Sequence, residues 1–461
     1  MNYLRQEKGF YRSALMLMLP MVLQNLVTNS MALADTFMVG MLGESELAAV
    51  TLANSPFFIV SLMTFGVQSG TSVLAAQYYG RGDRDTLSRI LGMGWYASML
   101  LTLLMGLAAV TIPEQIMHIL TNNEALIAPG ASYCRWVGFA YFFDAISQIY
   151  IGIQRSMENT KLGMFVLSGA GLLNIFLNWC LIFGHCGLPR MGVAGAALAT
   201  TISRITKVIA VAVFMRFDKR MPLHWKLIFR PGKIIAKDFL RYALPVMINE
   251  TLWSTAQSIY SVIMGHMEGS AQILSAYTIS GNVDRVVAVG LFAMGASAAI
   301  IIGRDIGRGD RENIYKEAVG LMFMAVCIGV ASGVITLIVR ATLAEGLLFP
   351  LMGLSEGASG IAMYMLLVCA LVQPLRAVTM TGVVGVFRGG GDVNTAMLID
   401  ILPAYLLAVP VTALCGLVFG FGARVVYVTM LLDELLKVIL IFIRLPSRRW
   451  INDVTRELPQ E

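Results

Sequence analysis

One carboxyl group stands out among the side chains that could do chemistry in this sequence. Asp35 lies in an apolar segment fifteen residues after Pro20, about 22 Å along a helix, and Arg12 is the only basic residue before it in that segment. An ionisable group at membrane depth costs roughly 3 kcal/mol on insertion scales, so it is usually functional or paired. We therefore predict that Asp35 binds a cation or a proton.

The neighbours of Asp35 form a polar face of the same helix. Gln24, Thr28, Met31 and Asp35 are separated by four, three and four residues, a spacing that places them on one side. Polar groups facing lipid would lack hydrogen bonds. This face is therefore expected to line water or protein.

A second polar pair lies in another apolar segment. Asn174 and Asn178 are four residues apart and share one helix face, where they offer two carbonyl oxygens and two amides. With Asp35 and a threonine, Thr200 or Thr201, they could form an oxygen-rich site for a hard cation such as Na⁺. The alternative is that the asparagines only hydrogen-bond neighbouring helices, which is worth about 1 kcal/mol.

The second half of the sequence carries a different set of charges. At an offset of 225 residues Asp35 corresponds to Tyr260, while Glu250 begins its own polar stripe. Asp284 and the adjacent Arg285 cannot face the same way, and a Glu250–Arg285 pair would be structural or a gate. Further ionisable residues lie at membrane depth without partners that the sequence identifies, namely Asp144, Arg376 and Asp400.

Motifs of several enzyme classes are absent. The sequence contains no GxxxxGK[ST], HExxH or GxSxG motif, and its four histidines do not cluster. Its six cysteines include no CxxC pair and are typical of packing residues. We predict that the protein is not an enzyme, has no catalytic residues and needs no cofactor other than a coupling ion, Na⁺ or H⁺.

The composition indicates the elements that must position these groups. The sequence has 461 residues, of which 57% are hydrophobic and 13% charged, against about 25% charged in soluble proteins. Its mean hydropathy is +0.73. The net charge of +6 is explained by basic residues that collect in cytoplasmic loops, so no nucleic-acid partner is expected.

Twelve apolar segments are long enough to cross a membrane as helices of about 20 residues. They lie near residues 14–40, 48–78, 91–112, 132–153, 162–184, 192–215, 240–265, 272–303, 318–339, 361–387, 397–417 and 425–443. The odd-numbered connectors contain only Arg190, Arg340 and Arg424 as basic residues. By the positive-inside rule both termini are expected in the cytoplasm.

The two halves of the chain repeat one another. Leu19-Pro20 recurs as Leu244-Pro245, and the turn Gly80–Asp85 recurs as Gly307–Glu312 at an offset of 227. The predicted organisation is an N-lobe (1–215), a cytoplasmic linker (216–239) and a C-lobe (240–461), each lobe with six helices. Because six is even, both halves start on the same side, and this architecture suits alternating access.

On these features the chain resembles the multidrug and toxic compound extrusion (MATE) transporters. The most specific stretches are Asn174–Asn178, Leu181–Gly184, Gly187–Pro189 and Met191–Thr200, followed in the second half by Arg388–Asp392. The resemblance covers residues 14–443. It implies two six-helix lobes that export organic cations or amphipathic drugs in exchange for Na⁺ or H⁺.

The resemblance also implies roles for single residues. Asp35 matches the carboxylate of the N-lobe cation site, Asn174 and Asn178 match its ligands, and Pro20 matches the proline at which the first helix bends. Asp392 matches an acidic residue of a C-lobe site, to which Glu250 and Asp284 are further candidates. One departure concerns Glu250, which follows Pro245 by five residues, whereas the family branch with a C-lobe site has its glutamate eight residues on, where Trp253 stands.

The sequence thus predicts a multi-pass antiporter of the bacterial plasma membrane. It would act as a monomer in the lipid bilayer on a small organic cation or amphipathic substrate. Two alternatives remain. A flippase for lipid-linked or anionic cargo would favour a cavity lined by arginines such as Arg285 and Arg376, and a receptor or scaffold would show no gradient-driven flux.

Overall fold

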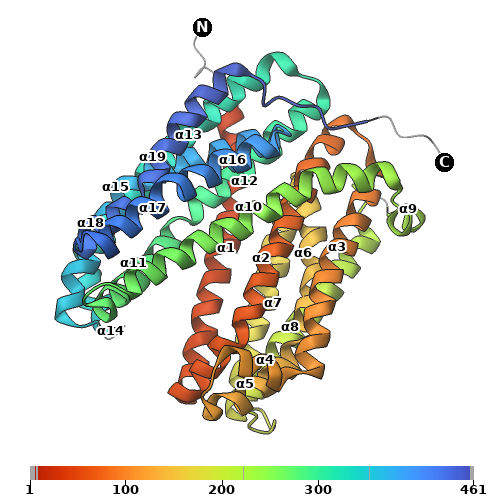
Figure 1. Cartoon of the computed structure of the whole chain (residues 1–461). Helices are drawn as coiled ribbons and strands as arrows, with labels where there is room; N and C mark the ends of the chain where they lie inside the picture. Colours follow the sequence, from red (N-terminus) through yellow and green to blue (C-terminus); the bar gives the residue numbers. More distant parts are fainter. Residues whose placement is uncertain (1–5, 7–8, 222, 352–353, 457–461) are drawn as a thin grey trace. The chain divides into compact units, whose positions relative to one another are not determined.

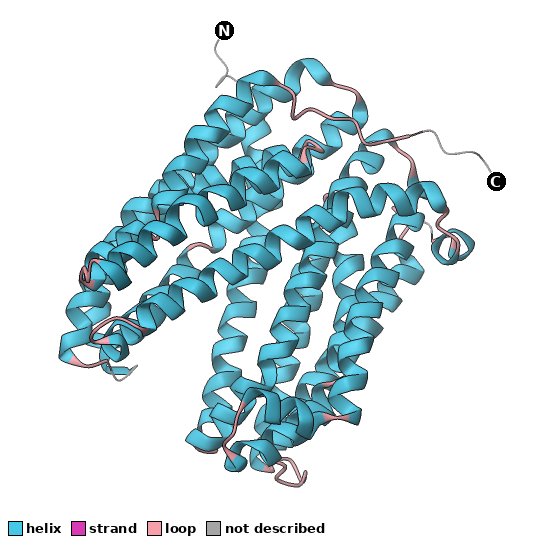
Figure 2. Cartoon of the chain, viewed as in Figure 1, coloured by secondary structure: helices cyan, strands magenta, loops and turns pink. Residues whose placement is uncertain are grey.

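The computed structural model describes residues 6, 9–221, 223–351 and 354–456, and it is almost wholly helical (Figure 2). No strand occurs within these residues. Parts of the predicted lobes and linker, at 1–5, 7–8, 222, 352–353 and 457–461, lie outside the described residues. The first half contains α1 (Phe10–Gly40), α2 (Glu44–Arg81), α3 (Arg84–Thr111), α4 (Pro113–Leu120), α5 (Glu124–Val137), α6 (Ala140–Ser156), α7 (Thr160–Phe183), α8 (Val193–Phe217) and α9 (Trp225–Phe229).

The second half begins with the long helix α10 and includes several short π-helical segments. Its helices are α10 (Lys233–Gly265), α11 (Ser270–Val287), α12 (Val289–Arg308), α13 (Arg311–Thr342), α14 (Phe349–Leu351), α15 (Glu356–Met380), α16 (Val393–Pro403), α17 (Val409–Ala413), α18 (Ala423–Thr429) and α19 (Leu432–Arg444). The π-helical segments are η1 (Ala344–Leu348), η2 (Thr381–Arg388), η3 (Ala404–Ala408) and η4 (Leu414–Val418), and a 3₁₀ turn, η5 (Leu445–Ser447), follows α19.

Helices occupy all twelve predicted apolar segments, which confirms the prediction of an all-helical membrane protein with twelve transmembrane helices in two six-helix lobes. Within the described part of the chain, nine helices are long and apolar enough to span a membrane, and a tenth span is the pair α5–α6, bent by 44°. The other two predicted segments correspond to α10 and to α18–α19. Both carry ionisable side chains in their interior, Glu250 in α10 and Asp433, Glu434 and Lys437 in α19.

Two compact units divide these helices. One comprises Leu23–Glu250, and the other comprises the segments Met1–Val22 and Thr251–Glu461. Both boundaries therefore fall within long helices, shortly after Pro20 in α1 and Pro245 in α10. A proline inside a helix removes one backbone hydrogen bond, so these are natural points for a helix to change its neighbours. The predicted domain limits at residues 215 and 240 stay a prediction.

In the unit Leu23–Glu250, α2, α3, α6, α7 and α8 run side by side (Figure 1). Neighbouring pairs include α2 with α3, α3 with α6, α6 with α8 and α7 with α8. Phe57, Cys134 and Ile182 lie in its fully buried core. In the other unit, α12 and α13 pack with α15, and Met294, Phe387 and Ile441 are buried between helices.

Small residues on α2 let the first half of α10 approach closely. A Cβ atom at Gly66 would lie 2.6 Å from the Cα of Met247, and one at Gly70 would lie 2.4 Å from the Cα of Ala243. Both pairs are spaced by four residues, as in a GxxxG contact between membrane helices. This contact explains why the start of α10 belongs to the unit Leu23–Glu250.

We expect Gly70→Ala to destabilise the protein, because the added methyl group meets backbone that cannot move aside. Overpacking of this kind costs about 1 to 3 kcal/mol. Gly169→Ala is the matched control, since a Cβ atom at that helical position meets nothing within 4 Å. Thermal unfolding of the purified variants in detergent should show a lower midpoint for Gly70→Ala alone. Equal midpoints would contradict the close α2–α10 contact.

Candidate functional site

One face of α1 lies against α7. A Cβ atom at Gly163 would lie 2.8 Å from Gln24 Oε1, and one at Gly171 would lie 1.6 Å from Met31 Cε. Further along, the amide of Asn178 donates to Asp35. The face predicted from helical spacing is therefore the face that contacts α7. Thr28 is exposed and its hydroxyl donates to the backbone carbonyl of Gln24 at 2.8 Å.

The predicted site residues of the first half form one connected chain of polar contacts. Asn178 Nδ2 donates to Asp35 Oδ1 and lies 3.4 Å from Asn174 Oδ1. Asn174 Nδ2 lies 3.5 Å from Thr200 Oγ1, which donates to the carbonyl of Ala196 at 3.0 Å. Asp35 from α1, Asn174 and Asn178 from α7 and Thr200 from α8 are thus brought together. Thr201 is not part of this chain, because its hydroxyl donates to the carbonyls of Trp136 and Ala197.

Two features make this cluster unlike an ordinary hydrogen-bonded core. Asn178 is fully buried, and its Oδ1 atom has no hydrogen-bond partner among the described residues. Asp35 is half-buried and forms no ion pair within the described chain. An unpartnered buried oxygen next to a carboxylate is costly unless a further group binds there.

A cation close to Asp35 is already engaged elsewhere. The charge of Arg204 acts on Asp35, but its guanidinium lies over the ring of Tyr141, 3.8 Å from the centroid. Tyr141 stacks on Phe57, and its hydroxyl lies 3.4 Å from Asn54 Oδ1. Arg204 therefore lies within electrostatic range of Asp35 but does not form an ion pair with it.

Tyr133 and Asn54 are further members of the surroundings that the sequence prediction missed. Their side chains exchange hydrogen bonds of 3.1 and 3.2 Å, and Tyr133 is buried and within electrostatic range of Asp35. They come from α5 and α2. Nothing in their own spacing ties them to Asp35, so no sequence signal could have found them.

The arrangement suits one small positive charge. It contains one carboxylate, amide oxygens and a hydroxyl, which are the ligands of hard cations. No group of three His, Cys, Asp or Glu side chains that could hold a metal ion occurs in the described residues. A single carboxylate balances one proton or one monovalent ion, and the lining offers no excess negative charge for a divalent metal.

Asp144, whose partner could not be read from the sequence, forms an ion pair with Lys207. Asp144 comes from α6 and Lys207 from α8, and the two side chains are 22% and 9% exposed. Arg204 also lies within electrostatic range of Asp144. The charge of Lys207 in α8 is therefore balanced by a residue of α6, and this ion pair connects the two helices beside the candidate site.

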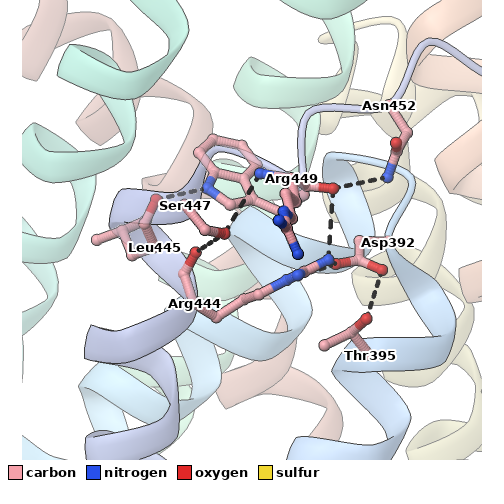
Figure 3. Close-up of polar contacts among 8 residues, drawn as sticks. Asp392, Thr395, Arg444, Leu445, Ser447, Arg449 and Asn452 are labelled. Carbon is pink, nitrogen blue, oxygen red and sulfur yellow. Dashed lines mark hydrogen bonds and ion pairs between the residues drawn. The ribbon is translucent and has the colours of Figure 1, made fainter.

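Two of the three acidic residues predicted for a second-half site, Asp284 and Asp392, have separate environments. Asp284 accepts hydrogen bonds from Arg376 Nη1 at 2.6 Å and Gln373 Nε2 at 2.8 Å. Asp392 accepts from Arg444 Nη2 at 2.5 Å and from Thr395 Oγ1 at 2.7 Å, as Figure 3 shows. Asp284 and Asp392 share no partner, so the structure does not join them into one site.

Four further charges of the second half, on Arg388, Asp400, Asp433 and Lys437, pair with one another. Lys437 lies 2.9 Å from Asp433 and 3.0 Å from Asp400, and Arg388 lies 3.9 Å from the other oxygen of Asp400. Glu250 is half-buried near the end of its compact unit. Its pairing with Arg285 stays a prediction.

Comparison with known proteins agrees with this architecture. A sequence profile of the MatE family matches residues 20–180 and 245–414, one match in each half of the chain. An uncharacterized transporter of Bacillus subtilis, YisQ, is 24% identical over 91% of this chain and 90% of its own length. The probable multidrug resistance protein NorM of Agrobacterium fabrum is 25% identical over 90% of this chain and 89% of its own.

The fold also matches solved structures. A MOP superfamily transporter from Pyrococcus furiosus superposes with a TM-score of 0.85, with 20% identity and 97% of each chain covered. It is described with a binding pocket of reverse polarity that suggests a different function. This likeness concerns the fold alone. The sequence match extends over most of the chain and both of its halves, and the chain therefore belongs to the MatE family of multidrug and toxic compound extrusion transporters.

Proposed function

We propose that this protein is a secondary antiporter that exports organic cations or amphipathic drugs by alternating access, with Asp35 as the coupling group for inward Na⁺ or H⁺. The observation that carries the proposal is the state of Asp35. Its carboxylate lies half-buried against Asn178, whose own Oδ1 has no partner among the described residues, and Asp35 forms no ion pair there.

Coupling follows from competition for one negative charge. A proton on Asp35 or a Na⁺ ion held by Asp35, Asn174, Asn178 and the Thr200 hydroxyl neutralises the carboxylate. An organic cation neutralises the same charge, directly or through the shape of α1 around Pro20. Because one carboxylate can balance only one positive charge, binding of the ion lowers the affinity for the drug and displaces it.

The surroundings of the transporter follow from the same proposal. It acts in the plasma membrane of a bacterium, as a monomer surrounded by lipid, with both termini in the cytoplasm. Twenty-nine methionines and 43 aromatic residues provide polarisable side chains that suit varied organic ligands. Cation–π contact is one means of binding them.

The test is substrate efflux from vesicles in which a Na⁺ gradient and a pH gradient are imposed separately. We expect an organic cation such as ethidium to leave against its gradient when one of the two is imposed. The ion that drives efflux is the coupling ion. Absence of flux under both gradients, with the protein present and folded, would contradict the proposal and favour a receptor or scaffold.

The flippase alternative fits the structure less well. Anionic or lipid-linked cargo would require unpaired arginines at depth, but Arg376 is bound to Asp284 at 2.6 Å. For the Pyrococcus furiosus transporter, a pocket of reverse polarity suggests a different function on the same fold. Transport of a lipid-linked anion instead of ethidium in the same vesicles would favour that alternative.

A further inference from the structure

The last helices of the two halves can be compared through a short repeat. Lys207-Val208-Ile209 recurs as Lys437-Val438-Ile439, an offset of 230 residues. Three residues before each lysine the two halves differ, because Arg204 corresponds to Glu434. On the first helices the acidic residue is in the first half instead, since Asp35 corresponds to Tyr260 at the offset of 225. The first half thus has a carboxyl group on its first helix, Asp35, where the second half has Tyr260. The second half has one on its sixth helix, Glu434, where the first half has Arg204.

Glu434 is the odd member of a connected group of charges. Arg376 pairs with Asp284 at 2.6 Å, and Lys437 contacts both Asp433 and Asp400. Asp284 is paired with Arg376, and Asp400 and Asp433 are paired with Arg388 and Lys437, so three carboxylates meet three cations and Glu434 is a fourth carboxylate beside them. One negative charge is left over. Glu434 carries it, because its hydrogen-bond partner within the described residues is the neutral Thr379.

The Thr379 hydroxyl fits both protonation states of Glu434. Its Oγ1 atom lies 2.7 Å from Glu434 Oε2 and 3.0 Å from the backbone carbonyl of Arg376. A hydroxyl has one proton to donate and can also accept. When Glu434 is ionised, Thr379 donates to it. When Glu434 is protonated, it donates to Thr379, which in turn donates to the carbonyl of Arg376.

A second, independent observation points to the same place. Tyr260 is 3% exposed, and its hydroxyl has no hydrogen-bond partner among the described residues. Asp433, Glu434 and Lys437 are all within electrostatic range of this hydroxyl. A buried hydroxyl without a hydrogen bond costs free energy of folding. The Tyr260 hydroxyl is therefore available to hydrogen-bond a nearby carboxyl group in either its protonated or its ionised form.

The charged groups around Glu434 come from several helices. Arg376 faces it from α15 and is itself bound to Asp284, Tyr260 faces it from α10, and its own helix supplies Asp433 and Lys437. Asp400 of α16 holds the Lys437 ammonium on its other side. Both cations that act on Glu434 are therefore already ion-paired with other carboxylates.

We propose that Glu434, which is hydrogen-bonded to Thr379 and lies within electrostatic range of the Tyr260 hydroxyl, is a second proton-carrying site of this protein, in the half of the chain where Asp35 has no acidic counterpart. Its place in transport rests on the proposed antiport function, but proton binding itself does not. The π-helical segment η2, which begins directly after α15, places Thr381 with a buried hydroxyl that also lacks a partner within the described chain. Such segments are frequent at functional sites.

The test uses the wild-type protein in liposomes and dicyclohexylcarbodiimide, which modifies protonated carboxyl groups in apolar surroundings. Modification is quantified by mass spectrometry of the peptide that contains both residues 433 and 434. We expect Glu434 to be modified more as the pH is lowered. The neighbouring Asp433 is the internal control and should react roughly tenfold less, because it forms an ion pair with Lys437 at 2.9 Å, whereas Glu434 is hydrogen-bonded to a neutral hydroxyl.

Two variants sharpen this experiment. Thr379→Val should change the pH dependence at Glu434 and leave that at Asp35 unchanged, since the two lie in different compact units. In Asp35→Asn the modification of Glu434 should persist. Transport by that variant then tests the coupling role of Asp35, whereas labelling of that variant tests proton binding by Glu434 alone.

Three outcomes would overturn the proposal. Glu434 could fail to react over the pH range in which Asp35 reacts, or Asp433 and Glu434 could react equally. Alternatively, Na⁺ could block the reaction of Glu434 at every pH, which would make it a metal-ion site and not a proton site.

Discussion

Asp35→Asn should abolish gradient-driven efflux while the protein remains folded in the membrane. The asparagine keeps the shape of the side chain, and its carbonyl oxygen can still accept the hydrogen bond from Asn178. Only the negative charge is lost. Interactions with a charged group are worth about 1.5 to 3 kcal/mol. The apparent affinity for the coupling ion should therefore fall by roughly 10-fold to 100-fold or more.

The matched control is Thr36→Val. Thr36 is the next residue of α1 and is exposed, and among the described residues its hydroxyl donates only to the carbonyl of Ala32 in the same helix. It should support wild-type efflux. Both variants are compared at equal protein content, with ethidium efflux measured under each gradient. Wild-type efflux in Asp35→Asn would remove the proposed role of this carboxyl group.

Much of the site in the first half could be predicted from the sequence, because it depends on helical periodicity. The spacing of Gln24, Met31 and Asp35 fixes one face of α1, and the spacing of Asn174 and Asn178 fixes one face of α7. Two faces that both carry polar groups in an apolar bundle are expected to meet. The family resemblance predicts that these two faces form one site. The structure contributes the hydrogen bond from Asn178 to Asp35.

The groups around that contact could not be predicted, since they depend on tertiary packing. Tyr133 and Asn54 reach the site from α5 and α2, and Arg204 is turned onto the ring of Tyr141. Whether an arginine near a carboxylate forms an ion pair or a cation–π contact depends on distances of a few ångströms. Periodicity within one helix contains no such information.

The long helices show the same limit at the level of the fold. The sequence predicts the apolar segments near residues 14–40 and 240–265, but not that each helix is shared between the two compact units after its proline. For α10 the reason lies in α2, where Gly66 and Gly70 admit the backbone of α10 at Ala243 and Met247. A glycine pair in one helix does not reveal which helix will use it.

Lys207→Met should be the most destabilising of the changes considered for the first half. The lysine is 9% exposed, and its ammonium neutralises Asp144, which is 22% exposed. Removing one partner of a buried ion pair typically costs about 3 to 5 kcal/mol, because the remaining charge is left in an apolar environment. We expect the lower part of that range, since Arg204 still acts on Asp144.

The double variant Asp144→Asn/Lys207→Met separates loss of charge balance from loss of packing. It leaves no unpaired charge, so it should recover most of the stability that the single variant loses. Arg135→Met is the control for an exposed pair, because Arg135 and its partner Glu114 are more than half exposed, and its effect should stay within about 1 kcal/mol. Thermal unfolding midpoints of the purified proteins in detergent measure all three. If Lys207→Met matched Arg135→Met, the pair between α6 and α8 would not be a determinant of stability, and Asp144 would have to be neutralised by Arg204 or by a proton.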